Sequence, residues 1–370
     1  MQDQTRLETD QGNAIGGGEA IGFQPAFVTP TLAQRVGPFA HEILLALVLV
    51  VLMLVAKGQD PRDGPWFVST GTQQNLLLNV WDLALLSLPM TYIIITGGID
   101  LSVASTMALS GVVMGICFQL WHWPMWVAAL MAVLTGGLGG LLNGVFVAKV
   151  KIHPLIVTLA TYSAYRGLAE GISLELASWY KAKPVYSGFP DWFTSLGQRA
   201  LLAGPDLRHP HWYALGAAGW LFIVAAIVMG VVLAKTPFGR TLYAIGHNET
   251  GARFSGLKVD RDKLIIYTLS GLAAGVACLN NAALNDTAQA SMAAGLELDV
   301  ITAVVLGGTS IFGGRGRIIG TVLGVALIHE TREFVSWHFT DDTLRRLVLG
   351  VLLIVVVALN ALLSRRSTRK

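Results

Sequence analysis

The chain has 370 residues, of which 53% are hydrophobic and only 13% are charged, and it carries a net charge of +3. Soluble domains carry about 25% charged residues, so this composition excludes an ordinary soluble protein. The small net charge gives no support to nucleic-acid binding. Uncharged runs such as Phe222–Ala234 and Leu347–Ser364 also lack the polar stripe of a helix on the surface of a soluble protein.

The first 36 residues are polar and low in complexity, and this composition predicts a disordered cytoplasmic tail. No basic region directly precedes a short apolar run at the start, so no signal peptide is expected. A transmembrane domain is predicted at residues 37–363, and a short basic cytoplasmic tail at residues 364–370. Cys117 and Cys278 lie in apolar surroundings and are interpreted as packing residues, and no metal-ligand spacing is present.

About ten segments of the chain are long and apolar enough to cross the membrane. Backbone polar groups in lipid must be bonded internally, so each segment is predicted to be a helix and the fold to be that of an all-α integral membrane protein. The third and the eighth are interrupted or short, and either is a candidate for a re-entrant or broken helix. In chain order the predicted spans are Gly37–Ala56, Leu76–Thr96, Leu101–Leu120, Pro124–Ala148, Leu155–Leu176, Trp212–Ala234, Leu264–Leu284, Leu298–Phe312, Ile318–Val335 and Leu344–Leu363.

Lysine and arginine predict the orientation of these spans, because both are enriched in cytoplasmic loops. Ten spans place the two termini on the same side of the membrane. With both termini inside, sixteen basic residues fall in cytoplasmic segments and eight fall outside. The count therefore predicts that both termini are cytoplasmic.

Two connecting segments are longer than ordinary loops, which indicates either function or disorder. The segment 179–211 is predicted to be external, and its aromatic residues suit a lid at the membrane interface. The segment 235–263 is predicted to be cytoplasmic and contains six basic and three acidic residues. Within it, the apolar spacing from Ala244 to Leu257 predicts a short surface helix.

Two glycine patterns concern the packing of the spans. Ile93-Ile94-Ile95-Thr96-Gly97-Gly98 resembles Ala303-Val304-Val305-Leu306-Gly307-Gly308. This similarity indicates either a weak internal repeat, as in many transporters, or a shared apolar composition alone. The segment Gly136–Gly144 contains two G-x-x-x-G spacings, which predict close approach of helices and carry no information about substrate.

Several catalytic motifs are absent from the sequence. No Gly-Lys dipeptide occurs, which excludes a phosphate-binding loop of the P-loop type. Neither a G-x-S-x-G elbow nor an H-E-x-x-H pair is present, although His329-Glu330 begins like the latter. The chain is therefore not expected to hydrolyse ATP itself, and no catalytic residue, cofactor or metal is predicted in it.

Among the ionisable residues in or beside the predicted spans, Asp82 lies in the second span, Asp100 follows the paired glycines, and Arg166 and Glu170 lie in the fifth span. Arg166 and Glu170 are four residues apart and should face each other on a helix, so a mutual ion pair is the favoured interpretation, with a gate or translocation path as the alternative. Asp100 precedes a new apolar segment and is interpreted as a helix N-cap. No titratable relay stands out, which argues against a proton-coupled carrier.

Four stretches of the sequence carry a family resemblance, in order over roughly residues 76–363. They are Thr96–Val103 with Gly97-Gly98-Ile99-Asp100-Leu101-Ser102, Asn143–Gly167 with His153-Pro154-Leu155, Phe238–Gly256 with Ala244-Ile245-Gly246-His247-Asn248-Glu249, and Glu297–Gly316 with Leu306-Gly307-Gly308-Thr309-Ser310. Together they resemble the permease family of bacterial ABC importers for monosaccharides of the ribose, xylose and rhamnose type, within the branched-chain amino acid and sugar permease superfamily. The departures from the family pattern are modest, at Ala104, His247 and Gly251, and leave the identity of the sugar open.

The resemblance implies that the third stretch forms a cytoplasmic coupling helix, which docks into a cleft of an ATPase subunit. Asn248 and Glu249 are expected to cap or orient this helix, and Gly256 is expected to end it. Ala252 is expected to share a face with Glu249 and Arg253 and to leave room for close docking. The residues assigned to coupling are Gly246, Asn248, Glu249, Ala252, Arg253, Ser255 and Gly256.

The resemblance also implies a transporter subunit, not an enzyme, that imports a monosaccharide or related polyol by alternating access in the bacterial inner membrane. It implies three partners: a cytoplasmic ATP-binding subunit that holds ATP and Mg²⁺, an extracytoplasmic sugar-binding protein, and a second permease copy, identical or different. An ABC permease for branched-chain amino acids or nucleosides stays open, while the coupling loop argues against a stand-alone carrier. The candidates for a translocation path or gate are Asp100, Asn143, Thr158 and Thr309.

Overall fold

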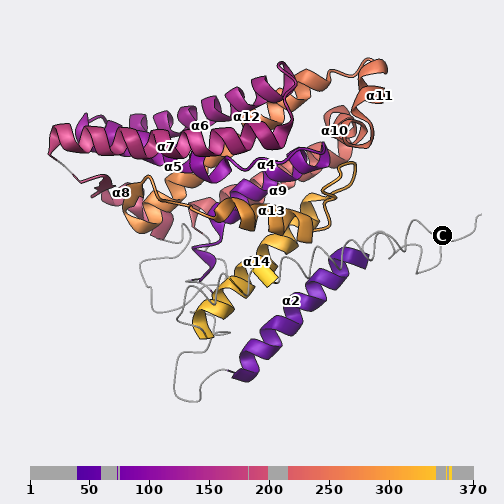
Figure 1. Ribbon diagram of the computed structural model, residues 1–370. Coiled ribbons are helices and arrows are strands. Elements are labelled where there is room, and N and C mark those ends of the chain that lie inside the picture. The colour runs from indigo at the N-terminus through magenta and orange to yellow at the C-terminus, as the bar shows by residue number, and fades with distance from the viewer. Residues whose placement is uncertain are drawn as a thin grey trace, which may run out of the picture. The chain divides into compact units, whose positions relative to one another are not determined.

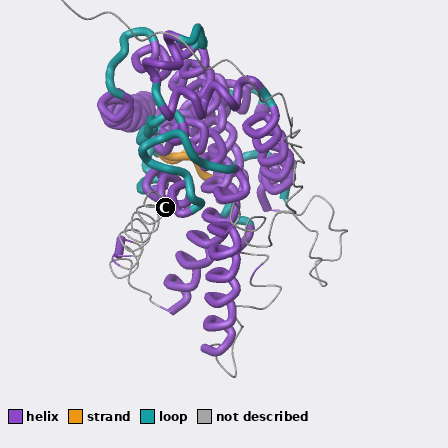
Figure 2. The backbone as a smooth tube through the Cα atoms, turned by 90° about the vertical axis from the view of Figure 1, so that its right-hand side faces the viewer, coloured by secondary structure: helices purple, strands orange, loops and turns teal. Residues whose placement is uncertain are grey.

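The structure is a computed structural model, and it describes residues 40–59, 73, 76–181, 183–198, 216–338, 347, 350 and 351. These residues are mostly helical, with one short pair of strands (Figure 2). The tails predicted at residues 1–36 and 364–370, and nearly all of the last predicted span, lie outside them. The all-α membrane fold predicted from the sequence is confirmed.

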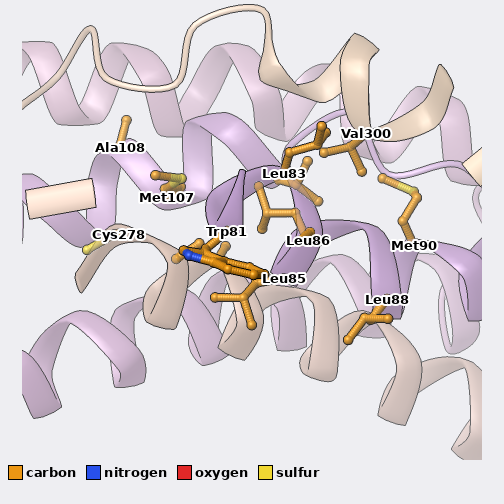
Figure 3. Packing of buried hydrophobic residues seen from close by; sticks show 14 of the residues in the cluster. Trp81, Leu83, Leu85, Leu86, Leu88, Met90, Met107, Ala108, Cys278 and Val300 are labelled. Atoms are coloured by element: carbon orange, nitrogen blue, oxygen red, sulfur yellow. The ribbon is translucent and has the colours of Figure 1, made fainter. Parts of the chain in front are cut away.

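Helix α4 (Trp81–Ile95) is surrounded by other helices, and all of its residues are buried. A helix that is apolar on every side must be covered on every side, which explains the absence of a polar stripe in this segment. Side chains such as Leu83, Leu86 and Met90 fill the space around it (Figure 3). The helices in contact with α4 include α9 (Ala217–Lys235), α10 (Pro237–His247), α12 (Val259–Asn285), α13 (Leu296–Leu306) and α14 (Ile318–His338).

Helix α5 (Val103–Gly115) continues directly into the π-helix η2 (Ile116–Leu120). Together they form an apolar segment of 18 residues, long enough to cross a membrane. The third predicted span is therefore not interrupted. What changes along it is the hydrogen-bond spacing, because the amide of Trp121 donates to the carbonyl of Ile116 five residues earlier.

Helix α6 (Met125–Ala148) makes its largest contact with α12, and α7 (Pro154–Tyr180) lies beside α5 and α6 (Figure 1). At this contact Gly140 lies so close to α12 that an added Cβ atom would be 2.2 Å from the carbonyl oxygen of Tyr267. The close approach predicted from the G-x-x-x-G spacing of α6 is confirmed. A second such spacing, Gly271 and Gly275, lies opposite on α12 and was not singled out from the sequence.

The strands β1 (Val185–Ser187) and β2 (Thr287–Gln289) form an antiparallel pair in which Tyr186 lies opposite Ala288. Asp286, just before β2, accepts hydrogen bonds from the amides of Gly188 and Phe189 at 3.3 and 2.9 Å. The short helix α8 (Asp191–Gln198) follows β1 and packs on α12. The predicted external segment is thus tied to the end of α12.

Helix α2 (Ala40–Gln59) packs on α14 (Figure 1). The ring of His41 forms a hydrogen bond of 2.8 Å with the carbonyl of Leu306, the last residue of α13. Glu42 pairs with Arg317, just before α14, at 3.3 Å. The start of α2 is therefore fastened to both ends of the loop 307–317.

The two similar glycine segments end their helices in the same way. After α4 the left-handed residue is Gly97 with φ +78°, and after α13 it is Gly308 with φ +89°. In both places the amide of this glycine donates to the carbonyl three residues back, and the next amide donates to the carbonyl five residues back. This pattern is a Schellman motif, and it is shifted by one residue relative to the sequence similarity. The segments therefore share a helix-ending device, although their registers differ.

Among the described residues, four helical segments have the length and hydropathy of a membrane span: Val103–Leu120, Met125–Ala148, Ala217–Lys235 and Val259–Asn285. Shorter apolar segments occupy His41–Leu54 and Trp81–Ile95. Helix covers at least part of each of the first nine predicted spans. The eighth is short, as predicted: α13 has 11 residues and ends at Leu306, so Phe312 lies beyond it in the loop 307–317.

Candidate functional site

The segment predicted to couple to an ATPase consists of two helices, α10 and α11 (Glu249–Phe254), which meet at Asn248 (Figure 1). Asn248 has an extended backbone with φ −159°, and its side-chain oxygen accepts a hydrogen bond of 2.9 Å from the amide of Gly251. This is the geometry of a helix N-cap, so the predicted capping role is confirmed. The short helix predicted within Ala244–Leu257 is present as α11, and the extended backbone at Asn248 separates it from α10, which covers the start of that stretch. We refer to residues 237–257 as the α10–α11 unit.

Gly256 ends α11, as predicted. Its backbone is left-handed with φ +79°, a conformation that strains most other residues. The amide of Gly256 donates to the carbonyl of Arg253, and the amide of Leu257 donates to the carbonyl of Ala252. These two bonds make a Schellman motif. The hydroxyl of Ser255, the C-cap residue, donates to the carbonyl of Gly251 at 2.9 Å and adds to the closure of the helix end.

Ala252 lies inside the α10–α11 unit, with only 5% of its surface exposed. It packs with Ile245 of α10 and Val259 of α12, and Leu257 covers this small cluster. The prediction that Ala252 lies on a docking face beside Glu249 is wrong. The turn at Asn248 folds α11 back against α10 and α12, and the methyl group of Ala252 fills the junction of the three helices.

Glu249, the first residue of α11, links this helix to the start of α12 through hydrogen bonds between charged side chains. It accepts from Arg253 at 2.9 Å and from Lys263 at 2.6 Å, and Arg253 also pairs with Asp260 at 2.6 Å. Burial alone would raise the pKa of Glu249, but the hydrogen bonds from Lys263 and Arg253 lower it below its ordinary value of 4.5. The hydrogen bond from Arg253 likewise lowers the pKa of Asp260. The four charges therefore tie α11 to the first turn of α12 at neutral pH.

Helix α10 is fastened to two other segments by close backbone contacts. Gly246 lies so near α4 that an added Cβ atom would be 1.9 Å from the carbonyl oxygen of Ile95. The same carbonyl accepts a hydrogen bond from the amide of Gly314 in the loop 307–317. The hydroxyl of Tyr243 donates to the carbonyl of Gly316 at 2.7 Å. A displacement of α10 must therefore act on the end of α4 and on this loop.

Two phenylalanines project from this part of the structure. Phe254, the last residue of α11, is 90% exposed, and Phe312 in the loop 307–317 is 94% exposed. Exposed aromatic side chains of this kind often anchor protein–protein contacts. Neither residue was predicted as functional. The available signal was an aromatic residue in a polar segment, but only the fold shows that Phe254 points outward while Ala252 points inward.

A buried polar cluster joins α5, α6 and α12 near the start of α5. One carboxylate oxygen of Asp100 accepts from the amide and the hydroxyl of Ser102, and the other accepts from the hydroxyl of Ser270 at 3.0 Å. The side-chain amide of Asn143 donates to the hydroxyl of Ser102 at 2.7 Å. Asp100 thus caps the turn that leads into α5, although the helix itself begins at Val103, after Ser102.

Thr158 lies in the same region, where its hydroxyl donates to the carbonyl of Ile99 at 3.1 Å. Thr309 lies apart from this cluster, against Gly316 in the loop 307–317. The structure therefore brings Asp100, Asn143 and Thr158 together in the interior of the helix packing and leaves Thr309 elsewhere. Their role in a translocation path or gate stays a prediction.

Arg166 does not pair with Glu170. One guanidinium nitrogen of Arg166 donates to the backbone carbonyls of Ala290 and Met292, while the side chain of Glu170 is exposed. Within the part of the chain that the structure describes, no ion pair links the two residues. The predicted pair is wrong because the guanidinium group of Arg166 donates instead to backbone carbonyls of a segment that is distant in the sequence.

Comparison with known proteins identifies the family of this chain. Residues 73–357 match the family described as "Branched-chain amino acid transport system / permease component". The ribose import permease protein of Bacillus subtilis is 33% identical over 328 residues, which cover 88% of this chain and 92% of that protein. The autoinducer 2 import system permease protein of Yersinia enterocolitica is 32% identical over 74% of this chain and 79% of that protein, and that of Escherichia coli K12 is 31% identical over 86% and 91%. The chain therefore belongs to the family of branched-chain amino acid transport system permease components.

Proposed function

We propose that this chain is the membrane-spanning permease subunit of an ATP-binding-cassette importer, and that it moves a monosaccharide or related polyol into a bacterial cell by alternating access. The family consists of permease components of transport systems, and the similar proteins are named as permeases for import of ribose and of autoinducer 2. The family and the apolar helices indicate a multi-pass protein of the bacterial inner membrane.

The α10–α11 unit is the observation that carries the coupling part of this proposal. It is stiffened by two caps and a set of ion pairs, and it presents Phe254 to solvent. It is also fastened to α4 through Gly246 and to the loop 307–317 through Tyr243. A partner that binds at Phe254 and then moves would therefore displace the C-terminal end of α4 and the loop 307–317 after α13 together. Rigid-body motion of packed elements is the usual basis of alternating access.

In this proposal the partners supply what the chain lacks. A cytoplasmic ATP-binding subunit holds ATP and Mg²⁺ and docks on the α10–α11 unit. An extracytoplasmic sugar-binding protein delivers the substrate to the opposite side, and a second permease copy completes the path. Both termini of the chain are cytoplasmic, in keeping with the sixteen-to-eight distribution of basic residues.

The nature of the substrate can be tested by uptake into proteoliposomes that contain the permease, the ATP-binding subunit and the binding protein. We expect ATP-dependent accumulation of at least one sugar among D-ribose, D-xylose and L-rhamnose, and no accumulation of L-leucine. The permease alone is expected neither to hydrolyse ATP nor to accumulate sugar. Uptake of leucine would favour the amino acid alternative, and uptake driven by a proton gradient without the ATP-binding subunit would contradict the proposal.

The docking role of the α10–α11 unit can be tested at Phe254. Replacing an aromatic anchor at an interface costs about 2 kcal/mol or more, which corresponds to a roughly thirtyfold loss of affinity. Phe254→Asp is therefore expected to lose association with the ATP-binding subunit and sugar uptake together, at normal membrane levels. Phe254→Leu, which keeps an apolar side chain, is the matched control and should retain most of both. Wild-type association of Phe254→Asp in a pull-down would show that docking occurs elsewhere.

A further inference from the structure

Arg166 lies near the middle of the fifth span predicted from the sequence, Leu155–Leu176. Helix α7 has 27 residues, and Arg166 is the thirteenth, so it lies about 18 Å along the helix from Pro154 and near the midpoint. An arginine near the middle of a membrane span has a high free energy unless its side chain faces protein or water. Such a residue is therefore a candidate for a functional site. One nitrogen of its guanidinium, Nη1, is occupied by the carbonyls of Ala290 and Met292.

These carbonyls belong to a stretch of irregular backbone. Residues 290–295 connect β2 to α13, and α13 has only 11 residues, about 16 Å of helix and half of a bilayer's hydrocarbon thickness. Irregular backbone at membrane depth is tolerated only where protein buries it or where it lines a water-filled cavity. In this stretch Ser291, Ala294 and Gly295 are exposed, so protein does not bury all of it. Broken helices of this kind hold the substrate sites of many transporters.

Two polar atoms at this break have no hydrogen-bond partner among the described residues. They are Nη2 of Arg166, a donor, and Oε2 of Glu297, an acceptor in the first turn of α13. Glu297 is only 8% exposed, and its carboxylate interacts electrostatically with Arg166. A buried polar atom that lacks a hydrogen-bond partner is destabilising, so each of these two atoms calls for a further group beside it.

We propose that Arg166 and Glu297 form a subsite for a hydroxyl group of the transported sugar or polyol. A hydroxyl is both an acceptor and a donor, so one oxygen can accept from Nη2 of Arg166 and donate to Oε2 of Glu297. This inference rests on the proposed function, and it assigns the substrate contact to the break before α13 and not to the Asp100 cluster.

The test uses the complete importer in proteoliposomes, with D-ribose, D-xylose and L-rhamnose as probes. Sugar uptake and the ATP hydrolysis stimulated by the binding protein are measured in the same preparation. Glu297→Ala is expected to lower sugar uptake per ATP hydrolysed at least about tenfold, as loss of one hydrogen bond to a charged group predicts. Glu297→Gln keeps an acceptor oxygen and is expected to lower it only a few fold. Glu170→Gln, on the same helix and exposed, is the matched control and should change neither quantity.

Two results would overturn the subsite. One is unchanged uptake by Glu297→Ala. The other is an equal loss of uptake and stimulated ATP hydrolysis in both Glu297 variants, which would mean that Glu297 only balances the charge of Arg166 within the fold. A wild-type importer that hydrolyses ATP but carries none of the three sugars would overturn the proposed substrate class and the subsite with it.

Discussion

The α6–α12 contact and the α10–α11 unit are held together by different physical means. Between α6 and α12, glycines let the two backbones touch, and no ion pair among the described residues contributes. In the α10–α11 unit, caps and charged hydrogen bonds surround a small apolar cluster. Lipid provides no hydrophobic drive between helices, so close backbone packing matters most there. Water solvates charges and orphan backbone groups, so each cap and ion pair outside the membrane contributes less.

The largest effect on the stability of the whole protein is therefore expected at the α6–α12 contact, because the other substitutions act within the α10–α11 unit. Gly140→Val places a Cβ only 2.2 Å from the carbonyl oxygen of Tyr267, and neither backbone can move aside without separating the helices. We expect a loss of about 3 kcal/mol or more, at the upper end of overpacking, with a lowered melting temperature in detergent. The matched control is Gly167→Val on α7, where an added Cβ meets no atom within 4 Å. Equal melting temperatures for the two variants would mean that this contact contributes little.

The second effect concerns the apolar cluster of the α10–α11 unit. Ala252→Glu buries a carboxylate between Ile245 and Val259, where the cluster offers no partner. An uncompensated buried charge costs about 3–5 kcal/mol, so the unit should open locally while the membrane helices stay folded. Limited trypsin digestion should then cut faster at Arg253 and Lys258. Ser255→Glu, on the exposed end of the same helix, should leave the cleavage rate near that of the wild type.

Features that depend on a few neighbouring residues were predictable from the sequence. The cap at Asn248, the helix end at Gly256 and the close approach at Gly140 follow from local backbone chemistry, and the structure confirms all three. Residue type and spacing suffice for these because the partner group lies on the same turn or is the backbone of any neighbouring helix.

Features that depend on distant segments were not predictable. The partners of Arg166 lie 124 and 126 residues away in the chain, so the pattern of four-residue spacing suggested Glu170 instead. The inward direction of Ala252 depends on where α11 folds against α12, which no local signal specifies. The same is true of Glu297, whose interaction with Arg166 accompanies the hydrogen bonds that Arg166 donates to Ala290 and Met292, just before α13.

A smaller effect is expected at the cap of α11. Asn248→Ala removes the acceptor for the amide of Gly251, and loss of an N-cap costs about 0.5–2 kcal/mol. The expected result is faster hydrogen exchange at the first amides of α11, with little change in the melting temperature of the whole protein. Asn248→Asp keeps the acceptor and should exchange like the wild type. If both variants exchange at the wild-type rate, the side chain does not stabilise the break between α10 and α11.

The smallest effect is the pH dependence of the ion pairs around Glu249. The pKa values of Glu249 and Asp260 are lowered in the folded protein from ordinary values of 4.5 and 3.8. A carboxyl group with a lowered pKa adds stability above its ordinary value, and this contribution disappears as the pH falls through the lower, folded value. Hydrogen exchange of residues 249–257, corrected for the intrinsic rate, should therefore be constant from pH 8 to about pH 5 and rise below about pH 4.

Glu249→Gln separates the charge of this residue from its packing. It removes one of the two titrating carboxylates and leaves the buried ammonium group of Lys263 without an anionic partner. We expect faster exchange than the wild type at neutral pH and a weaker rise in acid, because only Asp260 still titrates. Since both pairs are partly open to water, added salt should shrink the neutral-pH difference. Exchange in the variant that matches the wild type at pH 7, or rises as steeply below pH 4, would show that the caps alone hold α11. In that case the α10–α11 unit would resemble the α6–α12 contact, with backbone packing and hydrogen bonding dominant over charge.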